Sequence, residues 1–133
     1  MNFKLITDLK KLEGTMYYEF LAGPYQDKCW SAGSGFLVWD VFEIVEPIFS
    51  KRMACFDFQG RSQASAIEIA NICSDLDLAA CCESFAQLKQ LLKLNEGEWS
   101  SDQISELRVL AKDLSSWLGE KVKQSGVITI IGL

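Results

Sequence analysis

The residues with the most chemical interest lie in one apolar stretch, GFLVWDVFEIVEPIF, at positions 35–49. It carries three carboxylates at intervals of three residues, Asp40, Glu43 and Glu46, and a tryptophan, Trp39, stands directly before the first of them. On an α-helix, side chains three residues apart are neighbours on the same side. Carboxylates in this arrangement beside an aromatic ring have the composition of a protein contact surface with a charged rim.

A second chemical pattern is CFDFQGRS, which contains Asp57 and Arg61. We expect residues 53–60 to form a short strand ending at Gly60, so that Asp57 lies in the strand and Arg61 lies in a strand-to-helix turn, where α/β enzymes often place their chemistry. Asp57 could accept a proton and Arg61 could hold a carboxylate or phosphate. The alternative is that Asp57 points to solvent from an edge strand and Arg61 lies on a loop.

Histidine is absent from the chain. This excludes Ser-His and Cys-His nucleophile pairs, histidine metal sites and an imidazole general base. The five cysteines have no Cys-x-x-Cys spacing, so we expect reduced thiols, mostly buried, and neither a disulfide framework nor a zinc site. The sequence therefore favours a protein that is not an enzyme and has no metal or cofactor.

Length and charge limit the possible partners. The chain has 133 residues, 49% of them apolar and 23% charged, which predicts a single globular domain over residues 1–133. The net charge of −5 argues against binding to nucleic acid or anionic membranes and favours a cationic protein partner. The N-terminal segment has no signal-peptide pattern and no apolar run is long enough to span a membrane, so we expect a cytoplasmic protein.

The periodicity of residues 36–49 predicts a helix, with Ser34 as its N-cap and an end or kink near Glu46 caused by Pro47. On a helical projection the apolar residues form one arc: Leu37, Val38, Val41, Phe42, Ile44, Val45, Ile48 and Phe49. The carboxylates fall on the opposite side, together with Trp39 and Phe36. The helix would therefore present these two aromatic residues outside the core.

The remaining elements predict an α+β or α/β fold, with a small sheet packed against about four helices. Aromatic and β-branched residues favour strands within 1–22, although a helix over 6–13 competes, and residues 23–35 have the composition of a loop. Ser62 could cap a helix that runs to about Ser74. Two capping boxes predict further helices, Ser84 with Gln87 and Ser100 with Gln103, and the second helix ends at Gly126, before a buried strand at 127–131.

Aromatic residues in the predicted loops extend the candidate contact surface. Tyr25 and Trp30 lie in the first loop, and Trp99 lies between two helices beside Glu98. Exposed Trp and Tyr supply large contact areas at a small entropy cost. The alternative is that these rings close over the rim of the core. The candidate partner-binding set is Trp39, Asp40, Glu43, Glu46, Trp30, Tyr25, Trp99 and Glu98.

The C-terminal segment, a long amphipathic helix followed by SGVITIIGL, resembles the end of the barstar family of acidic cytosolic ribonuclease inhibitors, with a final strand of the parallel type. More broadly, a small, acidic, histidine-free chain with acidic and aromatic surface residues resembles the immunity proteins of bacterial toxin systems. This resemblance implies a one-to-one inhibitor of a cognate toxin. If the toxin is a nuclease, carboxylates on the inhibitor would pair with its basic cleft.

Two other functions stay open at this point. One is a small enzyme or ligand-binding domain that uses Asp57 and Arg61, which predicts a pocket at the strand-to-helix turn. The other is a subunit of a larger assembly, which would need a second apolar stripe on the long helix. Val109 gives little sign of such a stripe.

Overall fold

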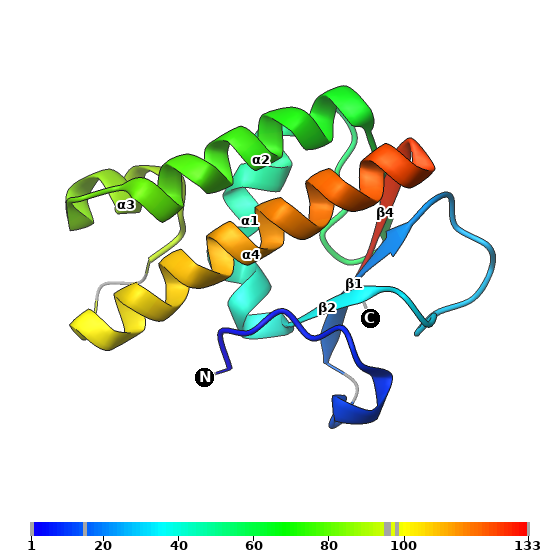
Figure 1. Ribbon diagram of the computed structural model, residues 1–133, viewed down its shortest axis with the longest axis horizontal. Coiled ribbons are helices and arrows are strands. Elements are labelled where there is room, and N and C mark those ends of the chain that lie inside the picture. The colour runs from blue at the N-terminus through cyan, green and yellow to red at the C-terminus, as the bar shows by residue number, and fades with distance from the viewer. Residues whose placement is uncertain (1, 15, 95–96, 98, 133) are drawn as a thin grey trace.

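The computed structural model describes residues 2–14, 16–94, 97 and 99–132, and it shows an α+β fold (Figure 1). The helices are η1 (Leu9–Lys11, a 3-10 turn), α1 (Trp39–Arg52), α2 (Ala66–Cys81), α3 (Phe85–Leu91) and α4 (Ser101–Ser125). The strands are β1 (Tyr17–Ala22), β2 (Gly35–Val38), β3 (Arg61–Ser65) and β4 (Val127–Gly132). The predicted small sheet packed against helices is therefore confirmed.

The four strands form one antiparallel sheet in the order β2-β1-β4-β3. The C-terminal strand β4 lies in the interior of the sheet, between β1 and β3, and it is antiparallel to both of them. The expectation of a parallel-type final strand is wrong. Its apolar sequence instead reflects burial on both faces, because residues 128–131 are all buried.

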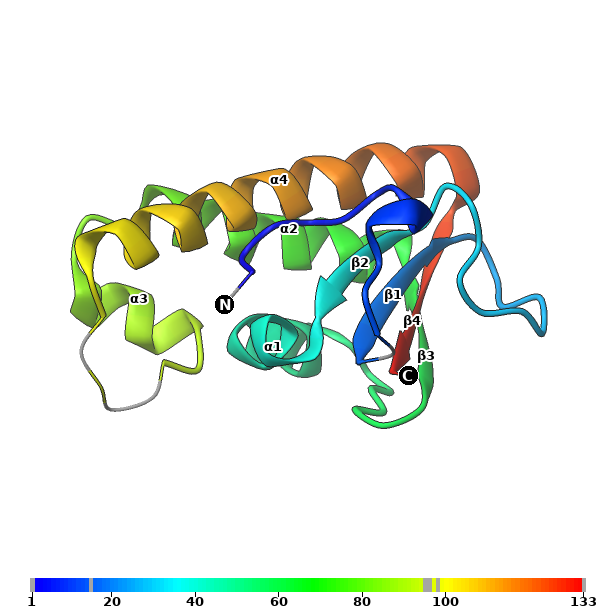
Figure 2. The ribbon, with the colours of Figure 1, turned by 90° about the horizontal axis from the view of Figure 1, so that it is seen from below.

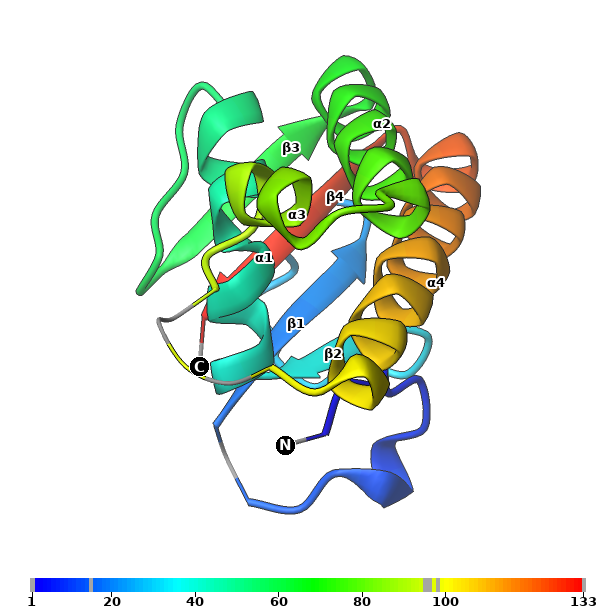
Figure 3. The ribbon, with the colours of Figure 1, turned by 90° about the vertical axis from the view of Figure 1, so that its left-hand side faces the viewer.

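The helices α1, α2 and α4 cover the same face of the sheet, and the main core lies between these two layers (Figure 3). From the sheet, Tyr18, Phe20, Ile128 and Ile130 enter this core. The opposite face is covered in part by the N-terminal segment and the β1–β2 loop, which enclose a small second cluster of Ile6, Tyr17 and Phe36. In addition, Ile6 pairs with Phe36 through two backbone hydrogen bonds of 2.9 and 2.8 Å, at the outer edge of β2.

The stretch 35–49 contains a strand and a helix, whereas the sequence predicted a helix alone. Residues 35–38 form β2, so α1 begins only at Trp39, and Ser34 is buried and does not cap it. Helix α1 also continues through Pro47 to Arg52, so the predicted end near Glu46 is wrong. The predicted inner face of the helix is confirmed, since Val41, Phe42, Ile44, Val45, Ile48 and Phe49 are all buried.

After α1, the next strand and helix begin later in the chain than the sequence predicts. Residues 53–60 form turns and irregular backbone where a strand was expected, and the strand β3 follows at Arg61–Ser65. Consequently Ser62 lies in β3 and does not cap a helix. Helix α2 is capped by Ser65, which forms a reciprocal capping box with Glu68, and it runs to Cys81 beyond the predicted end at Ser74.

The other helix ends agree with the sequence. Ser84 accepts a hydrogen bond from the Gln87 N–H, and Ser100 and Gln103 form a complete capping box. Gly126 ends α4 in the left-handed conformation, at φ +80°, and β4 follows directly. These signals are local in sequence, which explains why they could be recognised.

Three of the five free cysteines, Cys29, Cys55 and Cys81, are exposed, so the expectation of mostly buried thiols is wrong. Cys82 is buried, and burial raises the pKa of the half-buried Cys73 thiol.

In the described part of the chain, no helix combines the length and the apolar character that a membrane span requires.

Candidate functional site

The outer side of α1 carries the three carboxylates that the sequence singled out. Asp40 is exposed, and Glu43 and Glu46 are half-buried, on the side of the helix opposite the core residues. Among the residues that the structure describes, the only ion pair joins Arg52 to Asp75, at 2.7 Å. These carboxylates of α1 therefore have no cationic partner within the described chain.

Asp57 joins the α1 carboxylates around one buried phenol. The Tyr18 ring is fully buried and stacks on Phe42 with the ring centroids 4.0 Å apart, and its hydroxyl donates a hydrogen bond to the Phe58 carbonyl. Burial raises the pKa of Tyr18 above its ordinary value of about 10, and the negative charges of Glu43, Glu46 and Asp57 raise it further. All three carboxylates therefore act electrostatically on the same hydroxyl.

Two half-buried aromatic rings accompany these carboxylates. The Trp39 ring lies 5.4 Å from that of Phe58 and 5.7 Å from that of Tyr18, measured between ring centroids. Trp39 is therefore packed in place at the start of α1. Phe36, which was expected beside it, lies instead in β2 and is fully buried. We call the surface formed by Trp39, Asp40, Glu43, Glu46, Asp57 and Phe58 the acidic-aromatic face.

Local hydrogen bonds fix the turn that supplies Asp57 and Phe58. The Asp57 N–H donates to the Ser62 hydroxyl oxygen at 2.6 Å, and the Asp57 carboxylate accepts from the Gln59 N–H at 3.0 Å. At the far end of the turn, the Gly132 N–H donates to the Gly60 carbonyl at 2.8 Å. Any Cβ on Gly132 would come within 2.8 Å of the Phe58 carbonyl oxygen, so this glycine permits the close approach of the turn to β4.

Glu68 anchors the same segment from α2. Its carboxylate accepts hydrogen bonds from the Ser65 N–H at 3.0 Å and from the Ala54 N–H at 2.7 Å. These bonds lower the pKa of Glu68, the bond from Ser65 having the larger effect. The carboxylate of the α2 capping box, Glu68, therefore also holds the start of the 53–60 segment.

The predicted strand-to-helix site at Asp57 and Arg61 is wrong in its placement. Asp57 lies in a turn before β3, and Arg61 is the first residue of that strand. The two side chains also have different surroundings. Arg61 stacks on the Tyr25 ring, with its guanidinium carbon 4.2 Å from the ring centroid, while the Asp57 carboxylate lies against Gly60.

The β1–β2 loop holds two of the predicted contact residues, Tyr25 and Trp30, and extends from the sheet on the side away from α3 (Figure 2). A fully buried carboxylate, Glu19 of β1, accepts hydrogen bonds from the Trp30 and Ser31 N–H groups at 2.7 and 2.9 Å. Trp30 has a φ of +60°, and its ring contacts Tyr17 edge to face at 6.0 Å. This loop therefore closes over the second cluster. Sequence reasoning missed Glu19, since nothing local marks it as buried.

Trp99 is separate from both groups. It is half-buried, packs against the core, and its ring centroid lies 6.3 Å from that of Phe3. Glu98, predicted beside it, lies outside the described residues. The structure thus packs the turn of Asp57 and Phe58 on the first residue of α1, Trp39. The described contacts of Tyr25, Trp30 and Trp99 lie elsewhere in the fold.

No protein-family model, curated protein or solved structure matches this chain. Within the described residues, no three or more Cys, Asp or Glu side chains are grouped so that they could hold a metal ion.

Proposed function

We propose that the protein is a non-catalytic inhibitor of the immunity type, which binds and neutralises a cognate bacterial toxin through the acidic-aromatic face. The observation that carries this proposal is the packing of the turn with Asp57 and Phe58 against Tyr18 and against Trp39, the first residue of α1. The carboxylates of α1 and of this turn have no cationic partner in the described chain. Four carboxylates on one face, counting Asp40, attract a cationic surface.

The electrostatics favour a basic protein as the partner. Two opposite charges 4 Å apart attract each other by about 1 kcal/mol in water and by about 4 kcal/mol at the effective dielectric constant of a protein surface. Unpaired carboxylates leave this energy available for an intermolecular contact, and their shared sign also speeds association with a basic partner. A nuclease toxin meets this requirement, because its substrate cleft must be positively charged to hold a polyanion.

The aromatic residues of the face suit an interface as well. Trp39 and Phe58 are half-buried and are held by ring contacts to each other and to Tyr18, so their positions are set before binding. Preorganised aromatic anchors lose little conformational entropy on binding and are frequent among the residues that dominate interface energies. They would form the centre of the contact, with the carboxylates around them.

Calorimetry with a purified candidate toxin and the charge-reversal variant Glu43→Lys tests this function. The variant places a positive charge on the face, and we expect the dissociation constant to rise by at least about thirtyfold, or about 2 kcal/mol. The matched control is Asp77→Lys, an identical charge change at an exposed position of α2.

Circular dichroism verifies that both variants are folded. Equal affinities of the wild type and a folded Glu43→Lys variant would refute the proposed face. Weaker binding by Asp77→Lys of the same size would mean that only the net charge matters.

A further inference from the structure

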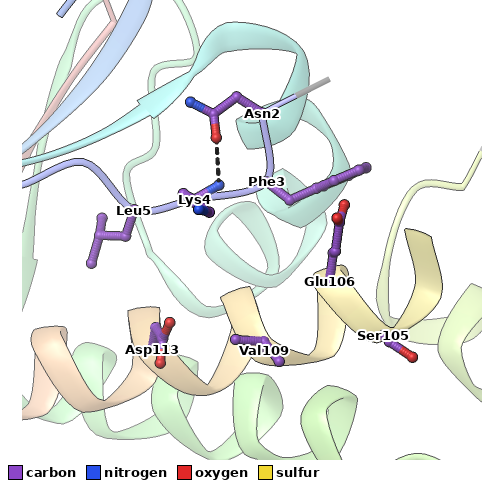
Figure 4. A pocket seen from close by; sticks show the side chains of 8 residues that line it. All are labelled: Asn2, Phe3, Lys4, Leu5, Ser105, Glu106, Val109 and Asp113. Carbon is purple, nitrogen blue, oxygen red and sulfur yellow. Dashed lines mark hydrogen bonds between the residues drawn. The ribbon is translucent and has the colours of Figure 1, made fainter. Parts of the chain in front are cut away.

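A groove of about 480 Å³ lies between the N-terminal segment and α4 (Figure 4). One wall is formed by residues 2–5 and the other by Ser105, Glu106, Val109 and Asp113 of α4. Val109 is 60% exposed although it is apolar, and Glu106 and Asp113 lie on either side of it. The groove uses elements different from those of the acidic-aromatic face.

The wall on α4 is part of a longer acidic stripe. At 100° per residue, Asp102, Glu106, Asp113 and Glu120 fall within an arc of about 40°, and all four are exposed. None of them forms an ion pair among the described residues. The groove therefore opens beside a row of carboxylates, and among the described residues Lys4 is the only cation that lines it.

The opposite wall is an irregular segment whose backbone is largely unpaired among the described residues. The Lys4 N–H donates to the Asn2 side chain at 3.1 Å, and Ile6 pairs with Phe36. Between them, the backbone N–H and C=O groups of Phe3 and Leu5 have no hydrogen-bond partner in the described part of the chain. Free backbone donors and acceptors can pair with an added extended segment.

We propose that this groove binds an extended basic segment of another protein, with the pattern basic-x-apolar-x-basic. In an extended segment, alternate side chains face the same way, so the apolar residue would lie on Val109 and the basic residues would meet Glu106 and Asp113. These two carboxylates are seven residues apart, or about 10.5 Å along the helix axis. Two basic residues four positions apart in a strand are separated by about 13 Å, a difference that long side chains absorb. Because Lys4 is a cation, the residue of the segment that lies next to it should be neutral.

The test uses the full chain and the capped peptide Thr-Lys-Thr-Val-Thr-Lys-Thr as the probe. Backbone amide chemical shifts of the labelled protein are followed during a titration to about 1 mM peptide. We expect the shifts to concentrate at residues 3–5 and 106–113. Peptides with glutamate in place of both lysines, or with glycine in place of valine, serve as controls and should bind more weakly.

Protein variants locate the contact. Asp113→Lys should weaken binding by about fivefold at low ionic strength, and Val109→Ser should also weaken it, whereas Asp77→Lys should have little effect. Equal binding by Asp113→Lys and the wild type, equal binding of the glutamate peptide, or shifts confined to α1 would each overturn the proposal. The variant Glu43→Lys should bind the probe like the wild type, so failure of this groove and failure of the proposed toxin contact can be told apart.

Discussion

Replacing Glu19 should have one of the largest effects on stability of any single substitution of a polar residue in this protein. Its carboxylate is fully buried and accepts the Trp30 and Ser31 N–H groups. A hydrogen bond to a charged group contributes about 1.5 to 3 kcal/mol. Glu19→Gln keeps one acceptor oxygen and should lower the free energy of unfolding by about 1.5 to 3 kcal/mol, whereas Glu19→Ala loses both bonds and should lower it by about 3 to 6 kcal/mol.

Urea unfolding followed by far-UV circular dichroism measures both values, and tryptophan emission reports on the loop. Because Trp30 also contacts Tyr17 and Phe36, we expect its emission to move to longer wavelength in the alanine variant at urea concentrations where the fold is intact. A stability of Glu19→Ala within about 0.5 kcal/mol of the wild type would show that the two hydrogen bonds do not hold the loop.

Three further outcomes follow from particular contacts. Because the pKa of Tyr18 is raised in the fold, its hydroxyl ionises at lower pH in the unfolded chain than in the folded protein. The free energy of unfolding should therefore fall by about 1.4 kcal/mol per pH unit above about pH 10. Urea unfolding of Tyr18→Phe at these pH values should lack this contribution. Gly132→Ala places a methyl group within 2.8 Å of the Phe58 carbonyl oxygen; it should lower the unfolding free energy by about 1 to 3 kcal/mol and weaken toxin binding in calorimetry. Gly126→Ala, at φ +80°, should lower the melting temperature through a loss of about 1 kcal/mol without changing toxin binding.

Local signals in the sequence were sufficient for much of the fold. The capping serines Ser100 and Ser84 and the glycine at Gly126 predict helix ends through contacts within a few residues, and the structure agrees. The full reciprocal box is seen at Ser100 with Gln103, whereas Ser84 accepts the Gln87 N–H alone. The same kind of signal, Ser65 with Glu68, was present at the start of α2 but was obscured by the strand expected at 53–60. A local pattern was therefore available for the start of α2, but Ser62 was chosen as the cap in place of Ser65.

Features that depend on distant parts of the chain could not be predicted in this way. Residues 35–38 continue the helical pattern of 39–49, but they pair with β1 and become a strand. The position of Asp57 depends on the approach of the 53–60 turn to β4 and Tyr18. The helical spacing of the α1 carboxylates identified them as one group. Three aromatic residues predicted to lie on the same surface, Tyr25, Trp30 and Trp99, make their described contacts in other parts of the fold.

Amide hydrogen exchange of the toxin complex would test the central claim most directly, because it locates the contact without altering the protein. Binding through the acidic-aromatic face predicts new protection in residues 39–46 of α1 and in the turn at 56–58, with little change in α2. Protection confined to the β1–β2 loop or to the outer surfaces of α2 and α4, with the start of α1 unchanged, would contradict it.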